Sequence, residues 1–325
     1  MKVSRRIVIM ISLVVVIAAA VAGGLRFLSP RDGSPAPESE PDPWERATGY
    51  YTLFDEDGEV LLETGLEITV GDEYIAPDNH HYRVVKVSGD RAYARLLGVL
   101  DLSSYLGPDW PAPPLSEKFA EATLEALPIG SRKKLLLVYH THSAESYIPT
   151  SGKRNIAEGG GILKVGEAFV DELRKAGFEV IHDKTNHGAA DAASYMRSRR
   201  IVFGYLKTRA PWALFDLHRD SSPPGTYRAT AGGKTIARVL IVVGRQNPNM
   251  RANLSLAKRI KAVSDQHYPD LVRGIYFARG TYNQDLDPAA LLFEMGTQTQ
   301  PREEAERGAR LWARMIAFAL GVGGP

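Results

Sequence analysis

Lys134-Leu-Leu-Leu-Val-Tyr-His-Thr-His-Ser-Ala-Glu-Ser-Tyr147 joins an apolar run to a group of polar side chains. Residues 135–138 predict a buried strand, because short runs of Leu and Val are typical of strands covered on both faces. His140, His142 and Glu145 follow directly, at the carboxyl end of this strand. In α/β proteins, ligand and metal sites collect at this end of the strands.

Two later apolar runs end in side chains of the same kind. Trp212-Ala-Leu-Phe-Asp-Leu-His218 ends in a histidine, and Ala290-Leu-Leu-Phe-Glu294 ends in a glutamate. The carboxyl ends of parallel strands share one edge of a sheet, so we expect His142 to lie beside these two residues.

Strands and helices alternate from residue 133 onward, which predicts an α/β domain with a mostly parallel sheet and helices on both faces. Segment 163–176 is amphipathic and is followed by Gly177, as expected at the C-terminal end of a helix. The predicted strands are 135–138, 178–181, 212–217, 235–243 and 290–293, and the predicted helices are 163–176, 191–207, 253–267 and 301–320.

The three strand ends together predict a zinc site. Two imidazoles, one carboxylate and a water molecule in the fourth position are a ligand set that suits zinc. His142 and Glu145 are three residues apart, close enough to share a cation. Zinc polarises a carbonyl and acidifies water, and a nearby glutamate moves the water's proton to the leaving amine. We therefore expect amide hydrolysis with Glu294 as general base; an ion pair between Glu294 and an arginine is the alternative.

Charged residues surround the second predicted ligand, His218. Asp216-Leu-His-Arg-Asp220 buries three charges, which is costly unless they pair or bind a ligand. Asp216 or Asp220 is expected to hold the tautomer of the imidazole. Arg219 is expected to bind either a carboxylate of the protein or one of the substrate.

A polar loop, Tyr282-Asn-Gln-Asp-Leu286, precedes the last predicted strand. Its Asn283, Gln284 and Asp285 have two interpretations. They contact the substrate, or they form an ordinary turn that supports the strand end.

The bulk composition describes a globular protein. Of the 325 residues, 44% are hydrophobic and 24% are charged. The formal net charge of +2 gives no support for a nucleic-acid partner, which would need a basic face. The chain has no cysteine, which excludes disulfides, thiolate zinc ligands and cysteine nucleophiles.

The N-terminus predicts export from the cytoplasm. Lys2, Arg5 and Arg6 precede residues 7–22, an unbroken uncharged run that is apolar on every face and extends to Leu25. We therefore expect residues 1–27 to be a single-pass anchor in the cell membrane, with the remainder of the chain outside. A cleaved signal peptide, with its cleavage site at Ala20-Val-Ala22, is the alternative.

Composition shifts predict the domain organisation. Residues 28–45 are rich in proline and polar residues and predict a solvated linker. Residues 46–101 alternate apolar and polar side chains between Gly-Asp turns and predict a small β domain. Residues 102–130 form a second linker with a helix near 116–127, and residues 131–325 form the catalytic domain.

These motifs resemble a known family over residues 135–320, the stage II sporulation protein P family of N-acetylmuramoyl-L-alanine amidases. Each motif is unspecific by itself, and the set together is specific. The matching segments are Tyr139-His-Thr-His-Ser-Ala-Glu-Ser-Tyr147, Asp216-Leu-His-Arg-Asp220, Asn253-Leu254 with Tyr268-Pro269, Arg273-Gly274, Tyr282-Asn-Gln-Asp-Leu286 and Leu291-Leu-Phe-Glu-Met-Gly296.

The resemblance implies a zinc (Zn²⁺) enzyme that cuts the amide bond between N-acetylmuramic acid and L-alanine in peptidoglycan. It also implies cleavage of peptide cross-links as a further activity. Members of this family sit in a membrane and act with a lytic transglycosylase, of the stage II sporulation protein D type, and a membrane scaffold during engulfment of the forespore.

Carried over residue by residue, the resemblance gives His142 and His218 the role of zinc ligands and Glu294 that of the catalytic carboxylate. Glu145 is the expected third protein ligand, with Glu158 and Glu167 as alternatives nearer the first helix. His140 is then expected to support a ligand or the fold.

Three rival functions remain. A serine nucleophile at Ser143 or Ser146 is disfavoured, because neither serine stands in a Gly-x-Ser-x-Gly motif. A zinc carboxypeptidase or endopeptidase acting on stem peptides shares the ligand pattern, although not the loop before the last strand. An inactive wall-binding scaffold is disfavoured by the retained ligand residues.

Overall fold

A computed structural model describes residues 42, 44–46, 48–107, 134–188 and 190–321. Contacts divide the chain into two compact units, and all these residues belong to the second, residues 40–325. The helices are α3 (Ile148–Ser151), α4 (Ile162–Lys175), α5 (Ser194–Arg209), α6 (Met250–His267) and α7 (Arg302–Ala319), with 3-10 turns η1 (Ser103–Leu106) and η2 (Gln284–Leu286). The strands are β1 (Tyr51–Phe54), β2 (Val60–Thr64), β3 (Glu73–Ile75), β4 (His80–Ser88), β5 (Arg91–Val99), β6 (Leu135–Tyr139), β7 (Glu179–His182), β8 (Ala213–Asp220), β9 (Arg228–Ala231), β10 (Lys234–Ala237), β11 (Val239–Gly244), β12 (Val272–Ala278) and β13 (Ala290–Thr297).

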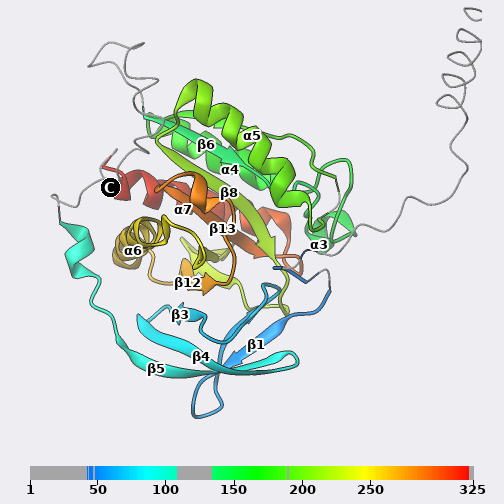
Figure 1. Cartoon of the computed structure of the whole chain (residues 1–325). Helices are drawn as coiled ribbons and strands as arrows, with labels where there is room; N and C mark the ends of the chain where they lie inside the picture. Colours follow the sequence, from blue (N-terminus) through cyan, green and yellow to red (C-terminus); the bar gives the residue numbers. More distant parts are fainter. Residues whose placement is uncertain (1–41, 43, 47, 108–133, 189, 322–325) are drawn as a thin grey trace, which may run out of the picture. The chain divides into compact units, whose positions relative to one another are not determined.

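An 11-stranded mixed sheet organises these elements, in the order β2-β1-β5-β4-β3-β12-β11-β13-β8-β6-β7. The run β7-β6-β8-β13 is parallel throughout, and β11 pairs parallel with β12. β13 and β11 pair antiparallel. The prediction of a large α/β sheet with mostly parallel strands is thus confirmed for β6–β13, and the sheet as a whole is mixed (Figure 1).

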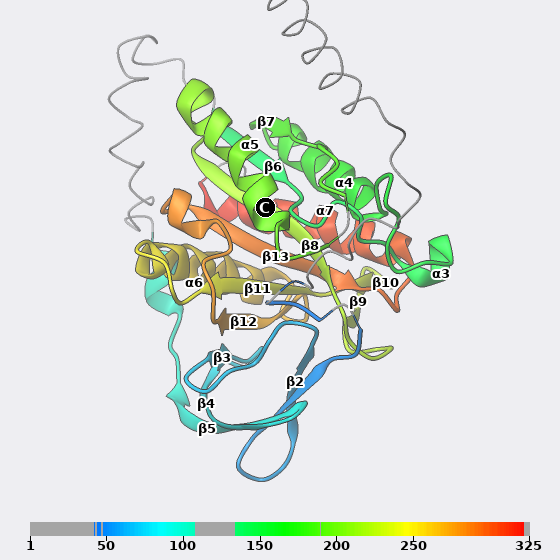
Figure 2. The same cartoon turned by 45° about the vertical axis from the view of Figure 1, so that its right-hand side comes forward.

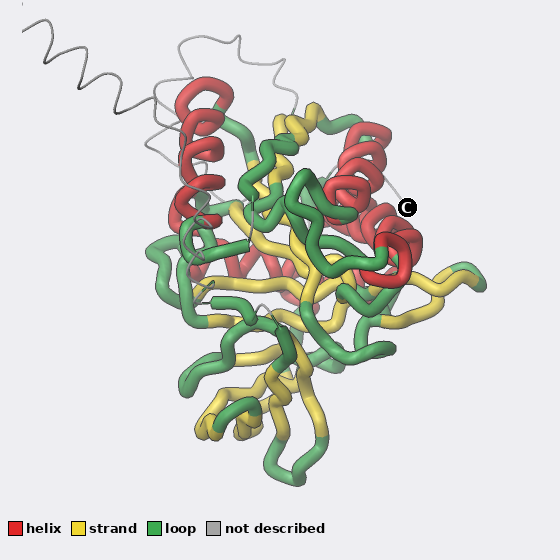
Figure 3. Tube along the Cα trace, turned by 90° about the vertical axis from the view of Figure 1, so that its right-hand side faces the viewer, coloured by secondary structure: helices red, strands yellow, loops and turns green. Residues whose placement is uncertain are grey.

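Alternation along each strand assigns side chains to the two faces of the sheet. In β11, Ile241 belongs to the apolar cluster formed with α4, α6 and α7. Its neighbours Leu240 and Val242 belong to a second cluster on the other face, together with residues of β2–β5. The helix α5 covers that other face over β6 and β8, through Val202 and Leu206. Helices therefore lie on both faces, three on one and α5 on the other (Figure 3).

The five N-terminal strands continue the main sheet, because β3 pairs antiparallel with β12 (Figure 2). Gly274 in β12 has a φ of +140°, and a Cβ at this position would lie 2.5 Å from the carbonyl oxygen of Ile75. Only glycine allows the two strands this close approach. Asp72, just before β3, accepts hydrogen bonds from Arg245 Nε at 2.6 Å and from the Tyr276 hydroxyl at 2.9 Å. This contact joins residues 51–99, which we call the β region, to residues 134–321, which carry the candidate catalytic side chains and which we call the catalytic region.

One predicted strand is divided in the structure, and one observed strand has no predicted counterpart. Residues 235–243 form two strands: β10 pairs with β9 in a hairpin, and β11 enters the main sheet after Arg238. Gly232 and Gly233, both with positive φ, make the hairpin turn. The strand β12 was not predicted, because Arg273 and Gly274 interrupt its apolar run.

Several predicted segments lie outside the described residues. These are the membrane anchor or signal at 1–27, most of the first linker, and the helix near 116–127. Within the part of the chain that is described, no helix has the length and apolar character of a membrane span.

Candidate metal centre

The register of two central strands brings a histidine and a glutamate side by side. β8 and β13 are parallel neighbours, and His218 is paired with Glu294. Alternation points Asp216 and His218 to the same face as Leu214, away from α4, α6 and α7. Both His218 and Glu294 are fully buried. The predicted meeting of these two strand ends is observed.

The loop after β6 supplies two more side chains to the same place. A backbone hydrogen bond of 3.0 Å from Glu145 N to the carbonyl oxygen of His142 closes a turn, which puts both side chains on one side. His142 Nδ1 lies 3.3 Å from Glu145 Oε1. The rings of His142 and His218 have their centroids 4.7 Å apart.

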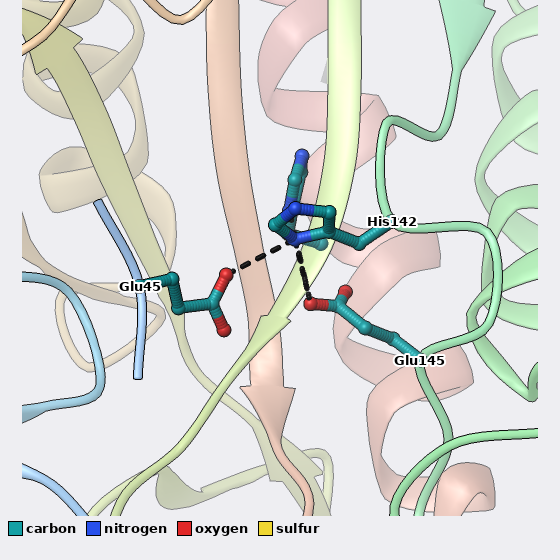
Figure 4. Close-up of side chains that lie close together, drawn as sticks. Glu45, His142 and Glu145 are labelled. Carbon is teal, nitrogen blue, oxygen red and sulfur yellow. Dashed lines mark ion pairs between the residues drawn. The ribbon is translucent and has the colours of Figure 1, made fainter. Parts of the chain in front are cut away.

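A fourth side chain, Glu45, completes this group. One ligand-type atom from each of Glu45, His142, Glu145 and His218 lies within 4.8 Å of all the others. Glu45 Oε2 is 3.1 Å from His142 Nδ1. Figure 4 shows Glu45 approaching from the blue N-terminal segment and Glu145 from the green loop after β6. We call these four residues the metal-binding group.

Each histidine presents Nδ1 to this group, because a carboxylate contacts its other ring nitrogen. His142 Nε2 is 3.0 Å from Asp42 Oδ2, and His218 Nε2 is 3.1 Å from Asp216 Oδ1. The backbone N–H and the hydroxyl of Thr141 donate to Asp216 and hold it in place. Carboxylates in this position fix the tautomer and orientation of metal-binding imidazoles.

Charge within the group favours a cation at its centre. Burial lowers the pKa of His142, but its three carboxylate neighbours raise it well above its usual value. Burial also lowers the pKa of His218, and Asp216 and Glu145 outweigh it. Burial raises the pKa of Glu145, whereas Arg219 and the two imidazoles lower it below its usual value. The carboxylates thus stabilise the protonated, positively charged imidazoles. The same negative charges would stabilise a bound divalent cation.

The polar atoms around the centre fit a metal ion. Both ring nitrogens of His218, the Nδ1 atom of His142 and both carboxylate oxygens of Glu294 are buried without a hydrogen-bond partner among the described residues. Buried polar atoms in native proteins are rarely left unpaired. Two imidazole nitrogens and two carboxylates form a donor set that binds divalent cations. The group can therefore hold a metal.

Glu294 is a carboxylate with an unusual environment. Burial, together with the charges of Glu45 and Asp220, raises its pKa well above the usual value. A buried carboxyl group with a perturbed pKa beside a candidate metal centre is suited to general acid–base chemistry. Glu294 is not one of the four residues of the metal-binding group.

Two alternative ligands lie elsewhere. Glu158 is exposed, and the Glu167 carboxylate pairs with Lys164 and Lys184 on the surface of α4. His140 points to the opposite face of the sheet, where its Nδ1 is 3.1 Å from the Leu217 carbonyl oxygen. Of the glutamates considered from the sequence, the structure brings Glu145 into the group.

Other residues considered from the sequence have structural contacts. Arg219 donates from its backbone N to Glu145 Oε2 at 2.8 Å, and its guanidinium lies 3.7 Å from Glu45. Asp220 accepts from Thr64 Oγ1 and from the Tyr227 hydroxyl, so it anchors the β region.

The polar loop before β13 is held by its own side chains. Asn283 donates to the Tyr195 carbonyl oxygen, and Gln284 donates to the Val242 carbonyl oxygen and accepts from Gly244 N. Asp285 forms a two-point ion pair with Arg199, with contacts of 2.8 and 2.6 Å. These contacts favour the interpretation of the loop as support for the strand end.

The two serines of the rival mechanism also have structural contacts. Ser143 Oγ accepts a hydrogen bond from His187 N at 2.9 Å. Ser146 Oγ is 2.9 Å from Ser151 Oγ. These contacts tie down the loop that carries His142 and Glu145.

Sequence reasoning missed Asp42 and Glu45. Both were assigned to a solvated linker, because prolines and polar residues dominate that stretch. The one signal against a linker was Trp44, an aromatic residue in a polar segment. In the structure, its ring packs 4.9 Å from Tyr195 and 5.6 Å from Tyr282, measured between centroids.

Comparison with protein families gives a match to the family described as stage II sporulation protein P, over residues 113–317. The stage II sporulation protein P of Bacillus subtilis (strain 168) is 32% identical over 203 residues, or 57% of this chain and 51% of that protein. The match thus spans about half the length of the curated relative.

Solved structures with partial likeness include three amidases. The N-acetylmuramoyl-L-alanine amidase AmiC2 of Nostoc punctiforme has a TM-score of 0.40 at 16% identity, covering 59% of this chain and 99% of that chain. The N-acetylmuramoyl-L-alanine amidase from Clostridium difficile 630 has a TM-score of 0.37 at 13% identity, covering 58% of this chain and 96% of that chain. The CwlD amidase from Clostridioides difficile, in complex with the GerS lipoprotein, has a TM-score of 0.40 at 12% identity, covering 58% of this chain and 96% of that chain.

Proposed function

Because the chain belongs to the stage II sporulation protein P family, we propose that it is a zinc-dependent peptidoglycan hydrolase that cleaves the amide bond between N-acetylmuramic acid and L-alanine. Cleavage of peptide cross-links in spore engulfment or wall remodelling is part of the same proposal. The observation that carries it is the metal-binding group with Glu294 paired in register beside His218.

The ligand assignment follows from the geometry of the group. His142 Nδ1, His218 Nδ1 and a Glu145 carboxylate oxygen would hold Zn²⁺, and Asp42 and Asp216 orient the two imidazoles. A bound Zn²⁺ would supply a Lewis acid that polarises the scissile carbonyl and acidifies water. The two histidines need their Nδ1 lone pairs free for this role, which the contacts of Nε2 provide.

Glu294 is the proposed general base and acid. Its burial and its register beside His218 support this role, in which it would take a proton from the attacking water and return it to the amino group of the leaving L-alanine. Arg219 holds Glu145 through its backbone N–H and balances the negative charge of the group. These two roles need no movement of the strands that carry them.

The setting of the enzyme is also a proposal. The apolar run at residues 7–22 supports an anchor in the cell membrane, with the catalytic domain on the outer side. Family membership supports a lytic transglycosylase of the stage II sporulation protein D type and a membrane scaffold as partners.

The test is digestion of purified peptidoglycan by the full chain, with mass spectrometry of the products and a zinc assay. We expect about one zinc per chain and stem peptides that begin with L-alanine. Glu294→Gln should keep the zinc and lose the products by about 100-fold or more, because a general base contributes 10²–10⁴-fold to the rate. Glu158→Gln, at an exposed position, is the matched control.

The other outcomes name other functions. Zinc with release of only C-terminal amino acids would make the protein a carboxypeptidase. Neither zinc nor products, including from transglycosylase-treated peptidoglycan, would contradict the proposal and favour a wall-binding scaffold.

A further inference from the structure

The N-terminal segment that carries Glu45 is fixed by its backbone. Glu45 pairs with Leu66 as an isolated antiparallel bridge. Glu67 N donates to the Trp44 carbonyl oxygen at 2.8 Å, and Arg46 N donates to the Gly65 carbonyl oxygen at 2.9 Å. We call residues 42 and 44–46 the strap. It is held at one side by the β region.

The side chains of the strap have two kinds of contact: one packs against the protein core, and two reach the metal-binding group. Trp44 packs against Tyr195 and Tyr282, as described above. Asp42 and Glu45 contact the two different ring nitrogens of His142. The Glu45 side chain is 10% exposed, so its carboxylate is largely withdrawn from water. A buried carboxylate needs charged partners, and Glu45 has two, the Arg219 guanidinium at 3.7 Å and His142 of the metal-binding group at 3.1 Å.

The number of protein ligands decides what a zinc site can do. Structural zinc sites have four protein ligands, whereas catalytic sites have three and keep one position for water or substrate. His142, Glu145 and His218 already supply three. A fourth ligand, the Glu45 carboxylate at 3.1 Å from His142 Nδ1, would take the position that a catalytic zinc site keeps for water or substrate.

We propose that Glu45 is the fourth ligand of the metal and that the strap thereby keeps the centre closed in its resting state. Catalysis requires the Glu45 carboxylate to leave, while Asp42 can go on supporting His142. The strap is thus an autoinhibitory contact built into the N-terminal segment of the enzyme. This inference rests on the metal centre of the proposed function, but its test does not depend on hydrolysis of peptidoglycan.

Two substitutions separate the closing residue from the supporting one. Glu45→Gln removes the anionic ligand and keeps the size of the side chain. Asp42→Asn weakens the support of His142 and leaves Glu45 in place. Loss of a carboxylate that orients a metal-binding histidine typically lowers metal affinity 10–100-fold. We expect Asp42→Asn to bind Zn²⁺ more weakly and to stay closed.

The probe for closure is acetohydroxamate, a small chelator that binds a metal through two oxygens once its open coordination position is free. Its affinity is measured on the full chain loaded with Co²⁺, from the change in the visible spectrum. If the open state is about a tenth of the population or less, Glu45→Gln should bind acetohydroxamate at least about tenfold more tightly than wild type. Glu45→Asp, whose side chain is too short to reach, should do the same and serves if Glu45→Gln fails to fold.

The same acetohydroxamate titration is run on a control variant. Glu59→Gln, in the exposed turn between β1 and β2, should match the wild type. Equal acetohydroxamate affinity of the wild type and both Glu45 variants would overturn the closed state.

Peptidoglycan digestion, run in parallel, keeps the two proposals apart. Release of stem peptides should increase about tenfold or more in Glu45→Gln. If it falls while acetohydroxamate affinity is unchanged, Glu45 is a catalytic group and the inference is wrong. If no variant releases stem peptides although Glu45→Gln binds acetohydroxamate more tightly, the closed centre stands and the proposed amidase function fails.

Discussion

The two histidines of the centre are oriented by the same device at the residue scale. An aspartate contacts Nε2 of each ring, so Nδ1 faces the metal-binding group. Asp216 belongs to β8, two residues before His218, and alternation along the strand places both on one face. Asp42 reaches His142 from 100 residues away in the sequence. The first pair was foreseeable from spacing, and the second was not.

Asp287 gives a pH-dependent prediction at the same scale. It is buried, and burial raises its pKa to about 7. The folded protein therefore keeps a proton on Asp287 between about pH 4 and pH 7 that the unfolded chain releases, so stability falls as pH rises through this window. Asp287→Asn removes this loss. We expect it to raise the free energy of unfolding at pH 8 by about 2–4 kcal/mol, and by less at pH 5.

Urea unfolding at pH 5 and pH 8 measures this difference. Asp287 accepts a hydrogen bond from Ala289 N, which the side-chain oxygen of asparagine can also accept. Asp270→Asn, at an exposed position, is the control and should not change the difference between the two pH values. A gain from Asp287→Asn that is the same at both pH values would contradict the assignment.

At the scale of elements, helix α4 depends on a glycine for its contact with the sheet. A Cβ at Gly166 would lie 2.6 Å from ring atoms of His140 and 2.8 Å from His182 Nε2. These two imidazoles are hydrogen-bonded to each other at 2.8 Å. Gly166→Ala should therefore lower the free energy of unfolding by about 1–3 kcal/mol, because overpacking displaces buried groups.

The helix α5 contains the matched control for this substitution. Gly204 is exposed, and a Cβ there would meet nothing within 4 Å. Gly204→Ala should raise the free energy of unfolding by roughly 0.5–1 kcal/mol, as alanine replaces glycine in a helix. Urea midpoints of the two variants are compared with wild type, and shifts in the same direction would refute the role of Gly166.

Most elements of the catalytic region were predictable, because their patterns are local. The strands β6, β8 and β13 begin with apolar runs, and α4 and α7 have amphipathic spacing with recognisable ends. The strand β12 was missed because Arg273 and Gly274 face a partner, β3, that lies about 200 residues earlier in the chain. Such a long-range reason leaves no periodic signal in the segment itself.

At the scale of the whole molecule, Asp72 ties the β region to the catalytic region. It is fully buried and contacts Arg245 and Tyr276. Asp72→Ala leaves these groups without their charge partner. We expect a loss of about 1–3 kcal/mol in the free energy of unfolding, because the hydrogen bonds of Arg245 and Tyr276 to a buried carboxylate are lost while Arg245 is 30% exposed.

Circular dichroism at 222 nm tests whether this loss reaches the catalytic region. The described α-helices all lie between residues 148 and 319, so the helical signal reports that region. If the two regions fold as one, Asp72→Ala lowers the melting temperature of the helices. Asp57→Ala, in the exposed β1–β2 turn, should leave it unchanged. Helices that melt at the wild-type temperature in Asp72→Ala would indicate two independent domains.

The site was predictable only in part for the same physical reason as the fold. His142, Glu145, His218 and Glu294 stand at the ends of strands, where a general rule for parallel sheets brings them together. No rule of this kind applies to Glu45. It reaches the group through a bridge to Leu66 and the packing of Trp44, and both depend on how the β region is placed.

The position of β13 has a consequence for the order in which the enzyme is made. It is the last strand of the chain, yet it lies between β11 and β8 near the middle of the sheet. In a chain whose synthesis has stopped before Ala290, β11 and β8 each have an edge without a strand partner. Unpaired strand edges promote aggregation. The same shorter chain lacks Glu294. Under the proposed function, and with export amino end first, the hydrolytic centre would stay incomplete until β13 has been delivered.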